Sequence, residues 1–333
     1  MRIPRFARWS EPSRERAISW EDASTALADS RSLSSWLEEV RYACGAFEWV
    51  TLAYLAWLGV ILIRFHRAIP RAAGLLAVHV AIAAGIAGVA WSAARSQSSI
   101  VRFARSWYPL PLYIFFFEEL GGLVHAIFPG WFDRWLIAFD YNFAGVHPSI
   151  WLSRFASPAL NDAMQVAYMT YFLYLVILPA ILYAQRDRLA FWTVMTSTAV
   201  AHYSVYVIAV LLPVESPYYS LAALQTKTLT GSYCTALIEF IERLGRVHGA
   251  AFPSAHVAGS MVAILASWRY RRWLFWVCLP FFVAMCVSTV YGRYHYMADV
   301  LAGIAVSAMG FSVGTWLMRR RGALPETEAN VRE

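Results

Sequence analysis

Long apolar runs recur along this chain, and each is close to the roughly 20 residues that a helix needs to cross the hydrocarbon core of a bilayer. Backbone polar groups in lipid must pair within their own segment, so such runs have to form helices. The sequence therefore predicts an all-α, polytopic membrane helix bundle with about eight transmembrane helices. The predicted spans lie near residues 47–65, 72–91, 107–128, 160–184, 189–213, 255–268, 273–292 and 296–318.

The composition also favours a membrane protein. Hydrophobic residues make up 59% of the 333 residues and charged residues 15%, against roughly 45–50% and 25% in soluble domains. Intrinsic disorder is excluded, and a single soluble core could not bury this much apolar surface. Four cysteines are too few for a disulfide scaffold, and no Cys/His spacing fits a metal site. We therefore expect no metal and no other cofactor.

Arginines gather in the segments between alternate spans. They occupy the loops after the second, fourth and sixth spans and the start of the C-terminal tail. The positive-inside rule places these segments and residues 1–45 in the cytoplasm of a plasma (inner) membrane. The short loop at 66–71 also carries arginine and conflicts with this orientation, but four basic segments outweigh it. The net charge of +7 suits anionic lipid head groups, and we expect no nucleic-acid partner.

Two long segments then face the extracytoplasmic side. Residues 129–159 are rich in tryptophan and tyrosine, which predicts helices lying against the lipid head groups. Residues 232–247 have apolar and charged faces, which predicts an amphipathic helix. Within the spans, we expect His79 to be a packed or hydrogen-bonded core histidine, and Gly303 and Gly310 to allow close helix packing.

A short stretch at residues 252–256 (FPSAH) opens an apolar run. Proline is typical of a first helical turn and Ser254 is a common capping type, so we expect a helix to begin here. Free backbone N–H groups at a helix start bind phosphate, and His256 would lie beside a phosphate held there. Taken alone, the stretch is more typical of a plain helix cap with an interfacial histidine.

The stretch at residues 293–299 (RYHYMAD) has a stronger chemical pattern. His295 and Asp299 are four residues apart and share one helix face, so the carboxylate can accept the N–H of one ring nitrogen. That contact fixes the tautomer and makes the other nitrogen a nucleophile or a base. Arg293 has a planar guanidinium group that matches two phosphate oxygens. A purely structural role would not explain why these groups gather on the same side as His256.

Together the two stretches resemble the second and third signature motifs of the type 2 phosphatidic acid phosphatase superfamily. In that family, Pro-Ser-Gly-His is followed by Ser-Arg-x5-His-x3-Asp. Residues 253–256 match the first of these motifs except that Ala255 replaces glycine. In the second, Ser288, His295 and Asp299 match, whereas threonine replaces the arginine at position 289. The resemblance covers about residues 190–318.

Where this sequence departs from the family pattern, it resembles one branch of the family. The first family motif, Lys-x6-Arg-Pro, is missing, and a proline-rich loop at 213–219 takes its place. Such a loop, followed by Arg-x-His-x3-Asp, resembles the inositol phosphorylceramide synthase (inositolphosphotransferase) branch, which transfers a phospho-headgroup between lipids. Two extra N-terminal spans also fit that branch. Lys227 and Arg246 are candidate replacements for the missing basic groups, although ordinary loop charges are the commoner case.

The resemblance implies a domain organisation in four parts. These are an N-terminal cytoplasmic or interfacial arm at 1–45, two additional transmembrane helices at 46–106, a phosphatidic acid phosphatase-like catalytic membrane domain with a six-helix core at 107–318, and a cytoplasmic tail at 319–333.

The resemblance also implies a two-step mechanism that needs no metal. His295 attacks the phosphorus of a lipid phosphate or phosphodiester and forms phosphohistidine, while Asp299 orients His295. His256 protonates the leaving oxygen and then activates the acceptor. The phosphoryl oxygens are stabilised by fixed cations and backbone amides, and the proposed substrate-binding residues are Arg293, Ser254, Ala255, Lys227 and Arg246.

The acceptor separates the candidate functions. A lipid alcohol or sugar makes the protein a phosphotransferase, whereas water makes it a lipid phosphatase acting, for example, on phosphatidic acid or a polyprenyl diphosphate. The departures from the phosphatase pattern favour transfer. A third alternative is a flippase-like or scaffold protein that binds lipid phosphates without turnover. In each case the expected partners are a phospholipid or lipid-linked phosphate and the surrounding membrane lipids.

Overall fold

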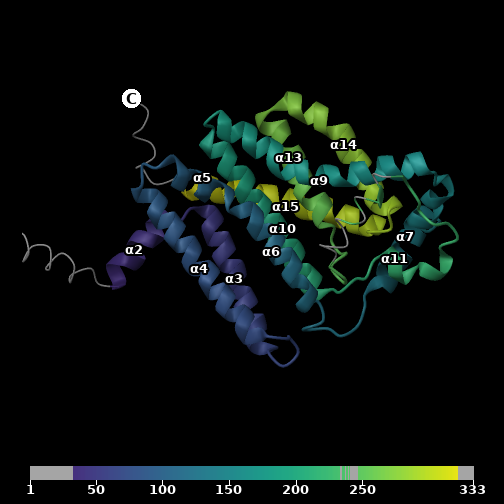
Figure 1. Ribbon diagram of the computed structural model, residues 1–333, viewed down its shortest axis with the longest axis horizontal. Coiled ribbons are helices and arrows are strands. Elements are labelled where there is room, and N and C mark those ends of the chain that lie inside the picture. Colours follow the sequence, from purple (N-terminus) through teal and green to yellow (C-terminus); the bar gives the residue numbers. More distant parts are fainter. Residues whose placement is uncertain (1–32, 233–234, 237, 239, 241–246, 322–333) are drawn as a thin grey trace, which may run out of the picture. The chain divides into compact units, whose positions relative to one another are not determined.

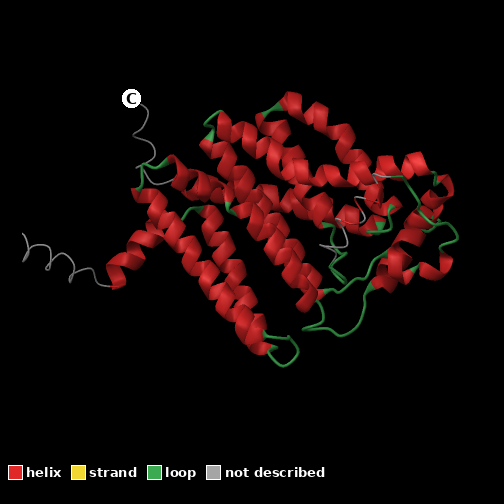
Figure 2. Cartoon of the chain, viewed as in Figure 1, coloured by secondary structure: helices red, strands yellow, loops and turns green. Residues whose placement is uncertain are grey.

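The computed structural model describes residues 33–232, 235–236, 238, 240 and 247–321. These residues form helices joined by loops, with no β-strand among them (Figure 2). Helix α2 (Leu33–Ala43) lies mainly in a first unit that ends at Tyr42, and all other described elements belong to the unit that begins at Ala43. The all-α expectation is confirmed for the described residues.

Six helices are long and apolar enough to cross a bilayer, which indicates an integral, multi-pass membrane protein. They match six of the predicted spans to within a few residues at most boundaries. These helices are α3 (Ala46–Arg64), α4 (Ala72–Arg95), α9 (Pro158–Ala184), α10 (Arg188–Leu211), α14 (Arg272–Tyr291) and α15 (Met297–Arg321).

The other two predicted spans form shorter helices. The run near 107–128 contains α6 (Pro109–Glu119) and the 3-10 turn η1 (Leu120–Gly122), and α5 (Ser99–Trp107) precedes it. Proline at position 109 starts a new helix there because it has no N–H to donate to the preceding turn. Helix α13 (Ala255–Tyr270) has 16 residues and spans about 24 Å, short of the roughly 30 Å hydrocarbon core. The structure thus shows six full-length candidate spans, whereas eight were expected.

Short helices occupy the segments between α6 and α9 and between α10 and α13. Residues 129–159 contain α7 (Asp133–Ala144), α8 (Pro148–Leu152) and the 3-10 turn η2 (Ser153–Phe155). The later segment begins with α11 (Pro217–Ser220) and the 3-10 turn η3 (Ala222–Leu224). The amphipathic helix predicted at 232–247 lies largely outside the described residues.

Helix α10 is buried along most of its length and packs against α3, α6, α9, α13 and α15 (Figure 1). Glycine allows its contact with α15, because a Cβ atom on Gly310 would lie 3.0 Å from the backbone nitrogen of Ala201. A Cβ atom on Gly303 would lie 2.9 Å from the carbonyl oxygen of Ser254 at the start of α13. The expectation that both glycines permit close packing is confirmed.

Buried contacts between charged or polar side chains connect the helices away from this contact. The Nε2 atom of His79 in α4 lies 2.8 Å from a carboxylate oxygen of Glu119 in α6, and both side chains are buried. This confirms His79 as a hydrogen-bonded core histidine. The Nε atom of Arg105 in α5 lies 3.0 Å from Glu48 in the first turn of α3, also with both side chains buried.

The connections between α13, α14 and α15 determine where the motif residues meet. Only Arg271 separates α13 from α14, whereas residues 292–296 connect α14 to α15. The start of α13 and the start of α15 therefore lie at the same end of the helices, joined by a hydrogen bond from the Ser254 N–H to the Asp299 carbonyl (3.1 Å). Arg271 lies at the other end, with a guanidinium nitrogen 3.3 Å from Asp187 at the start of α10.

Candidate active site

His295 lies in the connection before α15, and its ring is buried. Its Nδ1 atom is 2.8 Å from the carbonyl oxygen of Ala251 and 3.3 Å from Oδ2 of Asp299. A carbonyl oxygen can only accept a hydrogen bond, so Nδ1 must carry the hydrogen. The lone pair of the neutral ring is therefore on Nε2, the nitrogen that a nucleophile would use.

Asp299 lies in the first turn of α15 and is fully buried. Its Oδ2 accepts hydrogen bonds from the backbone N–H of Tyr296 (2.8 Å) and from Nδ1 of His295. A carboxylate at this position is also favoured by the partial positive charge at a helix N-terminus. The predicted contact between His295 and Asp299 is present, but the two residues do not share a helix face as expected, because His295 precedes α15. The Ala251 carbonyl, which the sequence did not reveal, reinforces the contact.

His256 is the second residue of α13, and its ring centroid lies 5.8 Å from that of His295. Two tyrosines of α9, Tyr168 and Tyr171, flank the imidazole with ring centroids 4.5 Å away. The hydroxyl of Tyr171 is 2.9 Å from Nε2 of His202, whose Nδ1 donates to the Thr198 carbonyl. Aromatic packing from α9 thus holds His256 beside His295, and sequence reasoning had given these tyrosines no such role.

The start of α13 is capped by Ser254. Its hydroxyl accepts a hydrogen bond from the N–H of Val257 (3.3 Å), and its own N–H is bonded to the Asp299 carbonyl. Ser254 is therefore occupied by contacts that hold the two helix starts together. No described residue accepts a hydrogen bond from the N–H groups of Ala255 or His256. These two amides are the ones available to an anion beside His256.

Arg293 is buried and ties the site to the segment that follows α11. Its Nη1 donates to Oε1 of Gln225 (2.9 Å) and its Nη2 donates to the carbonyl of Lys227 (2.7 Å). Its Nε has no partner among the described residues. Burial lowers the pKa of the Arg293 guanidinium group from its ordinary value. Much of the planar fork predicted to hold phosphate is thus engaged with the protein, and the Nε–H remains as a donor.

The two other predicted basic groups differ in position. The ammonium group of Lys227 is exposed and donates to the carbonyl of Arg154 (3.2 Å), so it is the backbone of Lys227 that reaches Arg293. Arg246 lies outside the described residues. The structure therefore brings together His295, Asp299, His256 and the helix start at Ser254, whereas Lys227 contacts only Arg293 among the predicted site residues that the structure describes, through its carbonyl.

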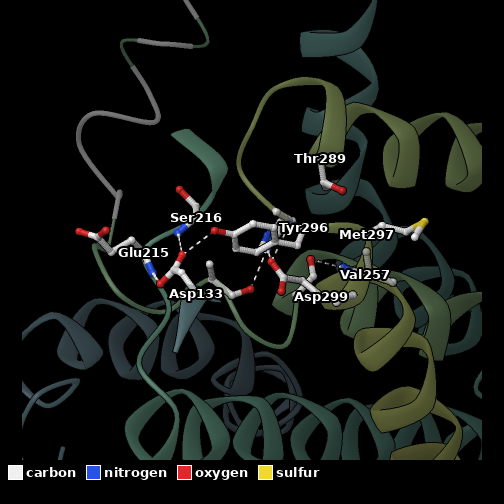
Figure 3. A network of polar contacts seen from close by, with 12 residues as sticks. Asp133, Glu215, Ser216, Val257, Thr289, Tyr296, Met297 and Asp299 are labelled. Atoms are coloured by element: carbon white, nitrogen blue, oxygen red, sulfur yellow. Dashed lines mark hydrogen bonds and ion pairs between the residues drawn. The ribbon is translucent and has the colours of Figure 1, made fainter. Parts of the chain in front are cut away.

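Two buried aspartates on α7, Asp133 and Asp140, also support this end of the helices. Oxygens of Asp133 accept hydrogen bonds from the N–H groups of Glu215 (2.9 Å) and Ser216 (3.2 Å) and from the hydroxyl of Tyr296 (2.7 Å) (Figure 3). Sequence reasoning had placed α7 only at the membrane surface. The missed signal is a pair of aspartates seven residues apart, on one face of an otherwise aromatic helix.

Asp140 accepts hydrogen bonds from the N–H groups of Met297 and Ala298, each at 2.9 Å. Burial raises the pKa of the Asp140 carboxyl, and these two hydrogen bonds oppose that rise. Burial likewise raises the pKa of the Tyr296 hydroxyl. Within the described ranges, no three His, Cys, Asp or Glu side chains meet as possible metal ligands.

A comparison with protein families identifies the chain. The model of the PAP2 superfamily, the type 2 phosphatidic acid phosphatases, matches residues 134–313. This range is more than half of the sequence and includes His256, His295 and Asp299. Comparisons with curated proteins and with solved structures found no match. None of these comparisons supports the narrower inositol phosphorylceramide synthase branch. The chain belongs to the PAP2 superfamily, whose members are lipid phosphatases and phosphotransferases.

Proposed function

We propose that this protein is a membrane-embedded phosphotransferase that moves a phospho-headgroup between lipid or lipid-linked substrates through a phosphohistidine on His295. Superfamily membership implies phosphatase or phosphotransferase chemistry on phosphate esters. The observation that carries the proposal is the hydrogen bond from His295 Nδ1 to the Ala251 carbonyl, 2.8 Å long, which assigns the lone pair to Nε2. This nitrogen is the nucleophile in the proposed mechanism.

In the first step, Nε2 of His295 attacks phosphorus, and the bond from phosphorus to the leaving oxygen breaks. His256 donates a proton to that oxygen, so the leaving group departs as an alcohol. The imidazole of His295 gains positive charge as the P–N bond forms. The carboxylate of Asp299, 3.3 Å from Nδ1, stabilises that charge and keeps the ring oriented.

In the second step, His256 acts as a base and takes the proton of an acceptor hydroxyl. The acceptor oxygen attacks phosphorus, the P–N bond breaks, and His295 regains its lone pair. A lipid or sugar hydroxyl gives headgroup transfer, in line with an inositolphosphotransferase-like activity. Water in the same position gives hydrolysis, the alternative that superfamily membership equally allows.

The phosphoryl oxygens need donors that are in place before the reaction. We assign this role to the N–H groups of Ala255 and His256 at the start of α13 and to the Nε–H of Arg293. Ser254 contributes indirectly, because it caps the helix that presents these amides. Lys227 and Arg246 are proposed as additional contacts to charged parts of the substrate.

A lipid substrate is supported by the outer face of α7. Trp135, Phe139 and Phe143 are four residues apart and are 64%, 45% and 69% exposed. An aromatic face of this kind suits the boundary between head groups and acyl chains. Because α7 also contacts the start of α15 through Asp140, the proposed site would lie at the membrane surface.

We further propose eight membrane crossings: the six full-length spans and two shorter ones formed by α6 and α13. Residues 46–106 would then supply two additional helices, 107–318 the catalytic membrane domain and 319–333 a cytoplasmic tail. The site would face the extracytoplasmic side of the plasma (inner) membrane, opposite the arginine-rich ends. Single cysteines introduced at Thr230 and Arg271 should react with impermeant thiol reagents from opposite sides, and labelling from one side would overturn this topology.

The experiment that tests the function uses purified protein in vesicles of a lipid extract. We expect headgroup-exchanged lipids by mass spectrometry, and inhibition by vanadate, which mimics a five-coordinate phosphoryl group. His295→Ala should form no product, whereas the matched control His66→Ala, which changes an exposed histidine between α3 and α4, should behave like wild type. Release of free phosphate without exchanged lipid would make the protein a phosphatase. If neither exchanged lipid nor free phosphate forms, the result would favour a protein that binds or flips lipid phosphates without turnover.

A further inference from the structure

Helix α7 turns its two aspartates away from its exposed aromatic face and toward the active site. Asp133 is 5% exposed and Asp140 is 2% exposed, so both carboxylates are removed from water. Burying a carboxylate is costly unless donors surround it. Three of the five donors that these two aspartates meet belong to residues 296–298, directly after His295.

Asp140 caps a helix to which it does not belong. The first N–H groups of an α-helix have no partner within the helix. Asp140 accepts two of them at the start of α15, from Met297 (Oδ2, 2.9 Å) and Ala298 (Oδ1, 2.9 Å). Each carboxylate oxygen thus satisfies one N–H group, and the negative charge is favourable at a helix N-terminus.

Asp133 holds the residue just before that helix. It accepts the hydroxyl of Tyr296 at 2.7 Å, and Figure 3 shows the Tyr296 ring lying between Asp133 and Asp299. Asp133 also accepts the N–H groups of Glu215 and Ser216. The loop after α10 and the start of α15 are therefore attached to the same carboxylate.

The segment 296–298 connects these contacts to the nucleophile. Its first N–H, from Tyr296, donates to Oδ2 of Asp299 at 2.8 Å, and the same oxygen lies 3.3 Å from Nδ1 of His295. Any displacement of this segment moves Asp299 and the backbone next to His295 together. The position of the His295 ring relative to His256 thus depends on α7.

We propose that Asp140 and Asp133 are positioning residues for phosphoryl transfer, which act by holding the start of α15 so that Asp299 and His295 are correctly placed. The inference rests on the proposed function, because their effect on rate requires His295 to be the reacting group. Neither aspartate is assigned contact with the substrate. Their effect should therefore appear in kcat and leave KM nearly unchanged.

The test compares Asp140→Ala with Asp187→Ala, because both replace an aspartate at a helix start. Asp187 caps α10 through the N–H of Ala190 (3.3 Å), at the end of the helices where Arg271 lies. We expect Asp140→Ala to lower kcat by roughly 10²-fold, the cost of a small misplacement of reacting groups. Asp187→Ala should leave kcat unchanged. Asp133→Ala should lower kcat as well, through the lost anchor on Tyr296.

Asp140→Asn provides a milder variant that folds if the alanine variant does not. An asparagine carbonyl can accept only one of the two N–H groups, so its kcat should fall between those of wild type and Asp140→Ala. Hydrogen–deuterium exchange supplies a readout that does not require turnover. Exchange should rise at Met297 and Ala298 in the Asp140 variants and at Ala190 in Asp187→Ala. Each substitution should leave exchange in the other region unchanged.

Three outcomes would overturn the inference. Normal kcat in both Asp140 variants of an active protein would refute the positioning role and leave the proposed function intact. A rise in KM that accounts for the whole loss would show that α7 binds substrate instead. A wild-type protein without phosphate-ester turnover would overturn the proposed function and the inference with it, even if the exchange pattern appears as expected.

Discussion

The helix starts of α13 and α15 meet at the candidate active site but are held in different ways. Ser254 caps α13 with its own side chain, three residues from the N–H of Val257. The start of α15 is instead held by Asp140, 157 residues earlier in the chain, while His295 beside it contacts the carbonyl of Ala251, 44 residues away. The side-chain cap of the α13 start is local, whereas the α15 start adds tertiary acceptors from α7 to its local acceptor Asp299.

This difference has consequences for the two histidines. The helix that presents His256 can form with the same cap wherever α13 is placed. The orientation of His295 depends on contacts from Ala251 and Asp299 and on the anchoring of α15 by α7. Losing a local cap costs about 1 kcal/mol. Leaving buried N–H groups without acceptors costs about 1–3 kcal/mol each and displaces the segment that carries them.

The largest expected effect is that of His295→Ala, which removes the histidine next to the start of α15. Removing the nucleophile should lower kcat on the order of 10⁶-fold, as is typical when an enzyme nucleophile is lost. Rapid quench with phosphorus-labelled substrate should find no labelled protein. Label that persists on this variant would identify a different nucleophile.

His256→Ala removes the histidine at the start of α13, and its effect should depend on the leaving group. An alkoxide needs protonation, so the rate with an alkyl ester should fall by roughly 10²–10⁴-fold. Nitrophenolate needs little help, and its ester should be cleaved at a partly restored rate. Equal losses with both esters would exclude His256 as the general acid.

Asp299→Ala should show whether Asp299 and the Ala251 carbonyl both orient the His295 ring. The Ala251 carbonyl remains at 2.8 Å from Nδ1 after this substitution, so the tautomer should be kept. We expect formation of the covalent intermediate to slow by roughly 10–100-fold without being abolished. Single-turnover rates measure this directly, and a loss as large as that of His295→Ala would contradict the shared orientation.

Gly303→Ala should disturb the contact between the two helix starts. The added Cβ would lie 2.9 Å from the Ser254 carbonyl and 3.0 Å from Cβ of Val257, so α15 must move away from α13. We expect a loss of about 1–3 kcal/mol in the free energy of unfolding, together with reduced kcat. Gly88→Ala in α4 is the matched control, because a Cβ there meets nothing within 4 Å. Similar losses in both variants would show that the α13–α15 contact is not responsible.

Ser254→Ala should have the smallest effect. It removes the local cap but keeps the N–H that donates to the Asp299 carbonyl. The free energy of unfolding should fall by about 1 kcal/mol, and Ser254→Gly should cost only a few tenths. Turnover should change little in either variant. A loss of kcat comparable to that of Asp140→Ala would mean that the Ser254 cap positions the reacting groups as strongly as the tertiary acceptors of α15 do.

Much of the helical framework could be predicted from the sequence. Six long apolar helices lie where apolar runs were found, because the length of a run is a local property that sets whether a helix can cross a bilayer. The run at 107–128 forms a shorter helix than expected, because α6 ends at Glu119 and only a 3-10 turn to Gly122 follows it. The contact between His295 and Asp299 was also expected from their spacing, but its reason differs: His295 precedes α15, and Asp299 in the first turn of that helix reaches back to it.

The support of the site could not be predicted in the same way. Every residue carries a carbonyl, so nothing in the sequence marks the one at Ala251 as the partner of His295. Arg293 has the chemistry of a phosphate ligand, but only the folded chain shows two of its nitrogens bonded to Gln225 and Lys227.

By itself, the sequence determined the all-helical membrane class, the position of most spans and the two histidines with their partner Asp299. These features depend on the length of apolar runs, on short spacing along the chain and on side-chain chemistry. The tertiary structure alone decided which buried donors and acceptors pair across α7, α9, α13 and α15. That choice depends on the packing of helices, because a buried carboxylate such as Asp140 must find its donors wherever the fold brings them.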